Sequence, residues 1–73
     1  MDLNKRIGEK IKKLRLERNL SQEKLAGLSE IDRTYMQSIE KGERNISINI
    51  LFKISKALEI KMSSIIENIE NEL

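Results

Sequence analysis

The sequence has 73 residues, a formal net charge of +2, and neither cysteine nor histidine. A chain of this length makes one small domain, and 38% apolar residues supply one compact core. Without cysteine there is no disulfide framework, and without histidine the usual zinc ligand and the usual general base are missing. The absence of proline, only two aromatic residues and many Leu, Ile, Lys and Glu favour an all-α fold.

The apolar residues are too scattered to cross a membrane, because no stretch approaches ~18 uninterrupted apolar residues. The first ten residues, MDLNKRIGEK, are too charged for a secretion signal. We therefore expect a cytoplasmic protein without a membrane partner.

A first helix is predicted from about Asn4 to Arg18, because apolar residues recur there at helical spacing. The stripe expected to face the core consists of Leu3, Ile7, Ile11 and Leu14. Asn19 should end this helix in a left-handed conformation. Residues 1–20 hold seven Lys or Arg and three Asp or Glu, a local charge of +4. A nucleic-acid partner and an ordinary solvated helix face both explain this cluster.

The stretch from Ser21 to Lys41, SQEKLAGLSEIDRTYMQSIEK, predicts two short helices joined by a tight turn. Ser21 and Asp32 are suited to cap these helices, since their side-chain oxygens accept hydrogen bonds from free backbone N–H groups. The break falls near Ser29 and Glu30. This arrangement is typical of a helix-turn-helix unit, which we place at about residues 21–41.

The second helix of this unit has one apolar face and one polar face. Met36 and Ile39 lie three residues apart and share the inward face. The outward face carries a guanidinium, an amide and two hydroxyls, from Arg33, Thr34, Gln37 and Ser38. Such groups read base edges and bind phosphates, so the pattern predicts a DNA-reading helix.

Two more helices are predicted in the last third of the chain. Gly42 should end the reading helix, Ser47 should cap a fourth helix from about Ile48 to Leu58, and a fifth should run from about Met62 to Asn71. The fifth helix carries an apolar stripe of Met62, Ile65, Ile66, Ile69 and Leu73. The whole chain, residues 1–73, is thus predicted to be one five-helix domain.

Three segments resemble the lambda-repressor-like helix-turn-helix domains of the Cro and xenobiotic-response-element family. They are IGEKIKKLRLERNLSQEKLA, IDRTYMQSIEKGERN and ISINILFKISKALEI, and together they cover roughly residues 5 to 69. Within that family the chain is most similar to the small controller proteins of restriction–modification systems. The resemblance implies a five-helix DNA-binding fold.

The resemblance also implies roles for individual residues. Arg33 would pair bidentately with a guanine, and Gln22 would contact the phosphate backbone and a base. Tyr35 would reach a phosphate through its hydroxyl or pack its ring on the domain surface. Arg44 and Asn45 would hold the sugar–phosphate chain. At each position an ordinary surface side chain is the alternative, which for Arg33 means an ion pair with a neighbouring acid.

Other positions have structural implications. Arg15 and Glu40 match the family's ion pair between the first helix and the reading helix. Glu30 stands where the turn often has glycine, and a left-handed conformation there would cost on the order of 1 kcal/mol. Gly27 costs about 1 kcal/mol relative to alanine inside a helix, which close packing against a neighbouring helix would justify. Lys61 replaces the usual capping residue before the fifth helix, whose start should fray.

The last third, about residues 48–73, has more apolar side chains than a monomer core needs. Phe52 lies about 100° off the inward face of its helix. Together with Ile65, Ile66 and Ile69 it is predicted to form a dimer interface around a two-fold axis. The alternative is that these residues close the monomer core.

These observations predict a transcriptional regulator of bacterial or phage origin that acts at the nucleoid. It should bind double-stranded DNA as a homodimer on an inverted-repeat operator. No cofactor, metal or small-molecule ligand is expected. An enzyme is excluded, since no nucleophile–base pair can be built without histidine or cysteine. The alternative is a protein-interaction module such as an antitoxin or anti-repressor, although antitoxins usually carry an additional toxin-binding segment.

Overall fold

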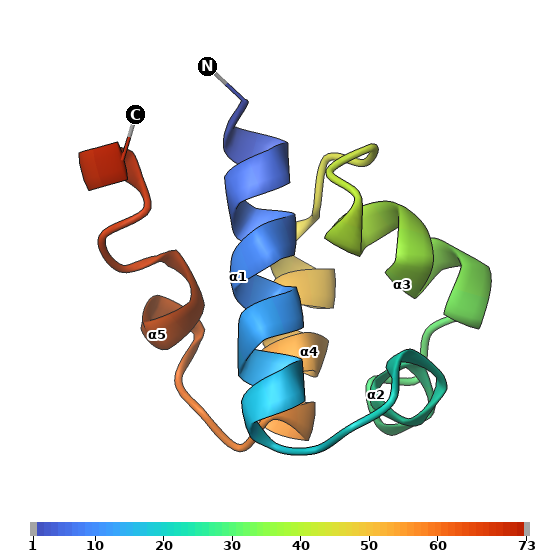
Figure 1. Ribbon diagram of the computed structural model, residues 1–73. Coiled ribbons are helices and arrows are strands. Elements are labelled where there is room, and N and C mark those ends of the chain that lie inside the picture. The colour runs from blue at the N-terminus through green and yellow to red at the C-terminus, as the bar shows by residue number, and fades with distance from the viewer. Residues whose placement is uncertain (1, 73) are drawn as a thin grey trace.

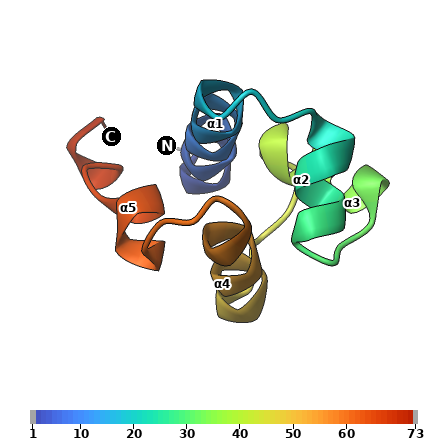
Figure 2. The ribbon, with the colours of Figure 1, turned by 90° about the horizontal axis from the view of Figure 1, so that it is seen from below.

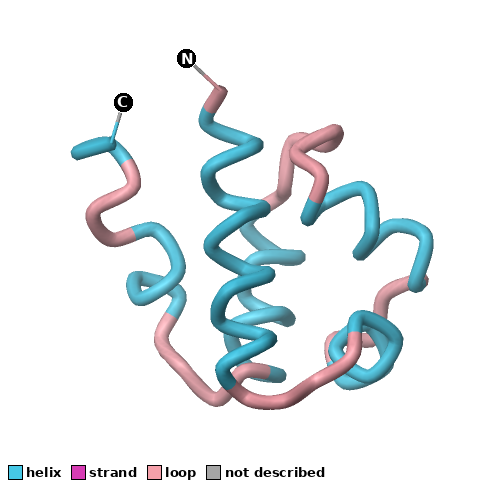
Figure 3. Tube along the Cα trace, in the orientation of Figure 1, coloured by secondary structure: helices cyan, strands magenta, loops and turns pink. Residues whose placement is uncertain are grey.

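The computed structural model describes residues 2–72, which form α-helices and one short 3₁₀ helix but no strand (Figures 1 and 3). The helices are α1 (Leu3–Glu17), α2 (Gln22–Leu28), α3 (Arg33–Glu40), α4 (Ile48–Ala57) and α5 (Met62–Ile66), followed by the 3₁₀ helix Glu70–Glu72. The predicted all-α fold of five helices is confirmed.

Four of these helices begin at a capping side chain. Asp2, Ser21, Asp32 and Ser47 each accept a hydrogen bond from a backbone N–H in the first turn of the helix that follows. These bonds satisfy donors that have no partner inside the helix. The three caps predicted from the sequence are therefore confirmed, and Asp2 adds a fourth that was not predicted.

One core joins all five helices. Its fully buried side chains are Ile11 of α1, Leu25 of α2, Met36 and Ile39 of α3, Ile54 and Leu58 in and after α4, and Ile65 of α5. Burying each such side chain contributes about 1.5–3 kcal/mol. α1 lies between α5 and the α2–α3 pair, and α4 closes the remaining side (Figures 1 and 2). Leu3, predicted to be part of the inward stripe, is half exposed because it is the first residue of α1.

The fifth helix is shorter than predicted. It ends at Ile66, since Glu67 is extended (φ −64°, ψ 139°) and Asn68 is left-handed (φ 66°). Lys61 provides no side-chain cap, and a five-residue helix has little internal stability. The reversal at Asn68 brings Ile69 back into the protein, where it is buried. A continuous helix to Asn71 is thus wrong, and Leu73 lies outside the described residues.

A left-handed residue follows each of the five α-helices, including Glu59 after α4. Asn19 follows α1 with a φ of 57°, as predicted, and Gly42 follows α3 with a φ of 77°. Glu30, in the turn between α2 and α3, has a φ of 58° and therefore carries strain on the order of 1 kcal/mol or more. Close packing does not explain Gly27, because no atom of another element lies within 4 Å of the place its Cβ would take.

Candidate nucleic-acid interface

α2 and α3 are joined by a turn that the backbone itself closes. The N–H of Glu30 donates to the carbonyl of Gly27 at 3.1 Å, and the N–H of Ile31 donates to that of Ala26 at 3.0 Å. Ile31 is half-buried and packs against the core. α2 and α3 each pack one face against the core, so the opposite face of α3 stays at the surface.

The exposed face of α3 carries the polar residues predicted to read DNA. Arg33, Thr34 and Gln37 are exposed, whereas Ser38 is half-buried and donates its hydroxyl to the carbonyl of Thr34 at 3.1 Å. The first turn of α3, capped by Asp32, thus presents a guanidinium and a hydroxyl, and the amide of Gln37 lies one turn later. These groups have the donors and acceptors that base edges require.

Arg33 also forms an ion pair at the surface. Its Nη1 lies 3.6 Å from Oε2 of Glu23, with side chains 68% and 75% exposed. Pairs this exposed contribute about 0–1 kcal/mol. The alternative considered for Arg33, a surface ion pair, is therefore present, but it is weak enough for the guanidinium to exchange Glu23 for a base.

A buried ion pair fixes the other end of α3. Arg15 Nε donates to Glu40 Oε2 at 2.7 Å, and Arg15 Nη2 donates to Glu40 Oε1 at 3.0 Å. Arg15 Nη1 donates to the carbonyl of Leu20 at 2.8 Å. The side chains of Arg15 and Glu40 are only 9% and 3% exposed. The pair implied by the family resemblance thus ties α1 to α3 in a rigid bidentate geometry.

Gln22 belongs to the same network. Its Nε2 donates to Glu40 Oε1 at 3.0 Å, which leaves a second N–H and the amide oxygen for a ligand. Gln22 is the first residue of α2 and is half-buried. The carboxylate of Glu40 therefore orients the amide of Gln22 at the start of α2.

The loop after α3 brings a second set of predicted contacts together. The guanidinium of Arg44 lies 5.5 Å from the centre of the Tyr35 ring, a cation–π arrangement. The Nδ2 of Asn4 donates to Oδ1 of Asn45 at 2.7 Å, which ties the loop to the start of α1. Arg44 and Asn45 are exposed, and Tyr35 is half-buried with its ring against the core cluster. Asn4 had not been singled out, because a pairing across 41 residues leaves no local sequence signal.

The four residues predicted for a dimer interface separate into two groups. Ile65 and Ile69 are buried within the protomer. They cannot offer a surface to a partner, because α5 packs on α1 and α4 and the chain reverses before Ile69. Phe52 and Ile66 are 50% and 43% exposed. For Phe52 and Ile66 the interface stays a prediction, and for the other two the alternative of a closed monomer core holds.

Two apolar side chains that were not predicted for the interface lie near Phe52. Ile48 is exposed and four residues before Phe52 in α4, so the two share a face, and Leu28 of α2 is half exposed and lines the same hollow as Phe52. We call Leu28, Ile48 and Phe52 the α4 patch. The apolar spacing of α4 predicted its buried face, and the same spacing identifies Ile48 as a partner of Phe52.

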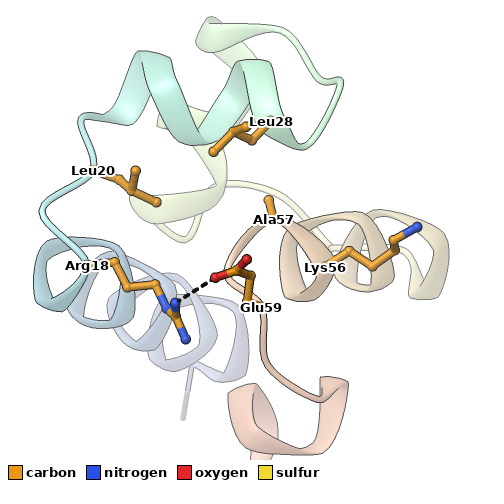
Figure 4. A pocket seen from close by; sticks show the side chains of 6 residues that line it. All are labelled: Arg18, Leu20, Leu28, Lys56, Ala57 and Glu59. Carbon is orange, nitrogen blue, oxygen red and sulfur yellow. Dashed lines mark hydrogen bonds and ion pairs between the residues drawn. The ribbon is translucent and has the colours of Figure 1, made fainter.

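A second hollow lies beside the α4 patch, between α1, α2 and α4 (Figure 4). It is lined by Arg18, Leu20, Leu28, Lys56, Ala57 and Glu59. Across this hollow, Arg18 Nη1 donates to Glu59 Oε2 at 3.4 Å. None of the residues predicted to contact DNA line this hollow. No cluster of acidic side chains among residues 2–71 is suited to hold a metal ion, and no helix in the described part of the chain is long and apolar enough to cross a membrane.

Two short helices at a fixed turn, with a polar face exposed on the second and its far end anchored to α1, define a helix-turn-helix DNA-binding domain. Residues 11–65 match the family model described as "Helix-turn-helix". The chain belongs to this family of DNA-binding transcription regulators. The resemblance noted in the sequence is thereby confirmed.

Relatives and solved structures place the chain, within this family, among the controller proteins of restriction–modification systems. The chain is 49% identical over 72 residues to Control protein C.MunI of Mycoplasma sp, with 97% of each chain covered. It is 43% identical over 62 residues to Control protein C.BamHI of Bacillus amyloliquefaciens, covering 84% of this chain and 76% of that one. The crystal structure of the restriction–modification controller protein C.AhdI from Aeromonas hydrophila matches with a TM-score of 0.84 and 37% identity, covering 85% of this chain and 94% of that one.

A further match is the controller protein C.Esp1396I, solved as a tetramer in complex with its natural 35 base-pair operator. The TM-score is 0.86 and the identity 39%, covering 99% of this chain and 95% of that one.

Proposed function

We propose that this protein regulates transcription in a restriction–modification system by binding a specific inverted-repeat operator in double-stranded DNA as a homodimer. The observation that carries the proposal is the exposed polar face of α3, held against α1 by the buried Arg15–Glu40 pair. The similar protein C.Esp1396I was solved as a tetramer with its natural operator, which supports operator binding by more than one protomer.

The exposed face of α3 would read the bases. Arg33 presents a planar fork of donors that matches O6 and N7 of guanine, while Thr34, Gln37 and Ser38 offer shorter polar groups on the same helix. Arg33 reaches the groove once it leaves Glu23, an exchange that costs little because both side chains are exposed.

The surrounding residues would bind the sugar–phosphate backbone. They are Gln22 at the start of α2, Tyr35 on α3, and Arg44 and Asn45 in the loop that follows. Phosphate contacts set the position and orientation of a protein on the duplex without selecting sequence. The network through Glu40 and the bond from Asn4 hold two of these groups in advance, which lowers the entropy lost on binding.

The α4 patch would supply the contact between two protomers. An exposed aromatic ring next to an exposed isoleucine and a half-exposed leucine is unfavourable in water and is relieved when a second copy covers it. A two-fold axis pairs the patch with itself. To read an inverted repeat, the two copies of α3 in such a dimer would lie in successive major grooves, about 34 Å apart.

Such a regulator works in the cytoplasm, where the bacterial or phage DNA lies, and it needs no cofactor, small-molecule ligand or catalytic group. Selection of bound duplexes from random DNA tests the proposal. We expect a palindromic consensus and a stoichiometry of at least two protomers per site. Recovery of no consensus, at a salt concentration where the protein still binds DNA, would contradict it.

A further inference from the structure

Gly8 is the point at which α1 and α3 touch through their backbones. A Cβ placed on Gly8 would lie 2.3 Å from the carbonyl oxygen of Ile39 and 2.8 Å from that of Glu40. Cβ atoms essentially never come within 3.0 Å of another heavy atom in this way. Both oxygens belong to the backbone, so no side-chain rotation relieves the contact. Only a movement of α3 relative to α1 makes room for a larger residue.

The same end of α3 is fixed to α1 on either side of Gly8. Two turns later along α1, Arg15 holds the Glu40 carboxylate. One turn earlier, Gly42 lies against Lys5, where a Cβ on the glycine would come within 2.5 Å of the Lys5 Cα. At Gly8 itself, only a hydrogen occupies the direction of the missing Cβ, so the backbone of α3 can come this close to α1.

This contact is tight enough to control where α3 lies. Bringing a Cβ from 2.3 Å to the 3.0 Å limit requires a shift of at least about 0.7 Å, whereas binding groups need to be placed within about 0.5 Å. Arg33 is the first residue of α3 and Ile39 the seventh. A displacement at the Ile39 end therefore tilts or translates the whole eight-residue helix and carries its reading face with it.

We propose that Gly8 is a positioning residue for DNA reading, and that the missing Cβ sets the depth and tilt at which Arg33 and Gln37 meet the base edges. This inference rests on the proposed function. It assigns to a residue with no DNA contact of its own a part in selecting the sequence that is bound.

The test compares two alanine variants with opposite surroundings. Gly8→Ala introduces a Cβ against two carbonyl oxygens, and Gly27→Ala introduces one into open space. Both glycines lie inside helices, so helix propensity favours alanine equally at the two sites. Both variants are titrated against the duplex selected by the wild-type protein and against a scrambled duplex, and the folded fraction is measured by circular dichroism.

We expect Gly8→Ala to lose about 10- to 100-fold in affinity for the selected duplex and to change less than about threefold on the scrambled one. Gly27→Ala should bind both duplexes like the wild type. A second selection with Gly8→Ala should return an altered or degenerate consensus. A stability role alone would leave the ratio of specific to non-specific affinity unchanged wherever the protein is folded.

Three results would overturn the inference. The first is a folded Gly8→Ala variant with wild-type affinity for the selected duplex, and the second is equal weakening on both duplexes. The third is a Gly8→Ala variant that stays unfolded even when combined with the stabilising Gly27→Ala, which would make Gly8 a folding residue. A wild-type protein without preference for any duplex would instead contradict the proposed function.

Discussion

Arg15 of α1 and Glu40 of α3 form a buried bidentate pair, with Nε–Oε2 and Nη2–Oε1 distances of 2.7 and 3.0 Å. The amide of Gln22 donates to the same Oε1 at 3.0 Å. One carboxylate therefore connects α1, α2 and α3, and it links the folding of the domain to the geometry of its DNA-binding face.

Glu40→Ala should destabilise the protein strongly. The substitution leaves the Arg15 guanidinium buried without its partner, and removing one member of a buried pair costs about 3–5 kcal/mol. Urea unfolding followed by circular dichroism gives the change in the free energy of unfolding. Glu23→Ala is the matched control, since it breaks an exposed pair and should cost less than about 1 kcal/mol. Equal losses for the two variants would show that the Arg15–Glu40 pair contributes no more than a surface contact.

Arg33→Ala should reduce both affinity and selectivity. Loss of a bidentate contact with guanine costs about 1–3 kcal/mol and relaxes the preference at one base pair in each half-site. Competition titrations with operator duplexes altered at single positions measure this. Glu23→Ala should keep or raise the affinity, because it frees Arg33 from its surface partner. If Arg33→Ala weakened specific and scrambled duplexes equally, Arg33 would be a phosphate contact.

Much of this arrangement follows from local sequence. Ser21, Asp32 and Ser47 cap helices because a short polar side chain at that position accepts a backbone N–H whatever the rest of the fold does. Apolar spacing likewise places Ile11 and Met36 in the core. A cap acts within one turn of helix, and an apolar stripe repeats along a single helix, so the sequence alone contains both signals.

The features that the sequence did not predict depend on contacts between distant segments. α5 ends at Ile66 because burial of Ile69 favours a chain reversal at Asn68 over a continued helix, although apolar spacing is compatible with both. Gly8 and Gly27 look alike in the sequence, as glycines inside helices. Only the approach of α3 to α1 distinguishes them, with two carbonyl oxygens near Gly8 and open space around Gly27.

Arg44→Ala should weaken binding to all duplexes by a similar factor. A phosphate contact releases condensed counterions, so its loss should lower the slope of log K against log salt by about 1. The affinity for selected and scrambled duplexes at several salt concentrations measures both effects. Tyr35→Phe is the companion variant. It keeps the ring over which Arg44 lies and removes only the hydroxyl. A change in base preference on Arg44→Ala would contradict a role restricted to the backbone.

Phe52→Glu should separate the dimer and leave the protomer folded. Phe52 is half exposed, so a carboxylate at this position remains hydrated in the monomer. In a dimer built on the α4 patch it would lie near its own copy across the two-fold axis. We expect the loss of hydration and the like-charge repulsion there to outweigh the attraction of Lys56, which lies over the Phe52 ring. Sedimentation should then report a monomer, and affinity for the full inverted repeat should fall to near that for a half-site.

Two further substitutions show which surface forms the interface. Ile66→Glu changes the exposed residue of α5 that was also predicted to contact a partner, and Ile69→Glu changes a buried one. If the α4 patch alone forms the contact, Ile66→Glu should stay dimeric. Ile69→Glu should lose helical circular dichroism at a lower temperature, because it buries a charge in the core. A dimeric Phe52→Glu variant together with a monomeric, folded Ile66→Glu variant would move the interface to α5.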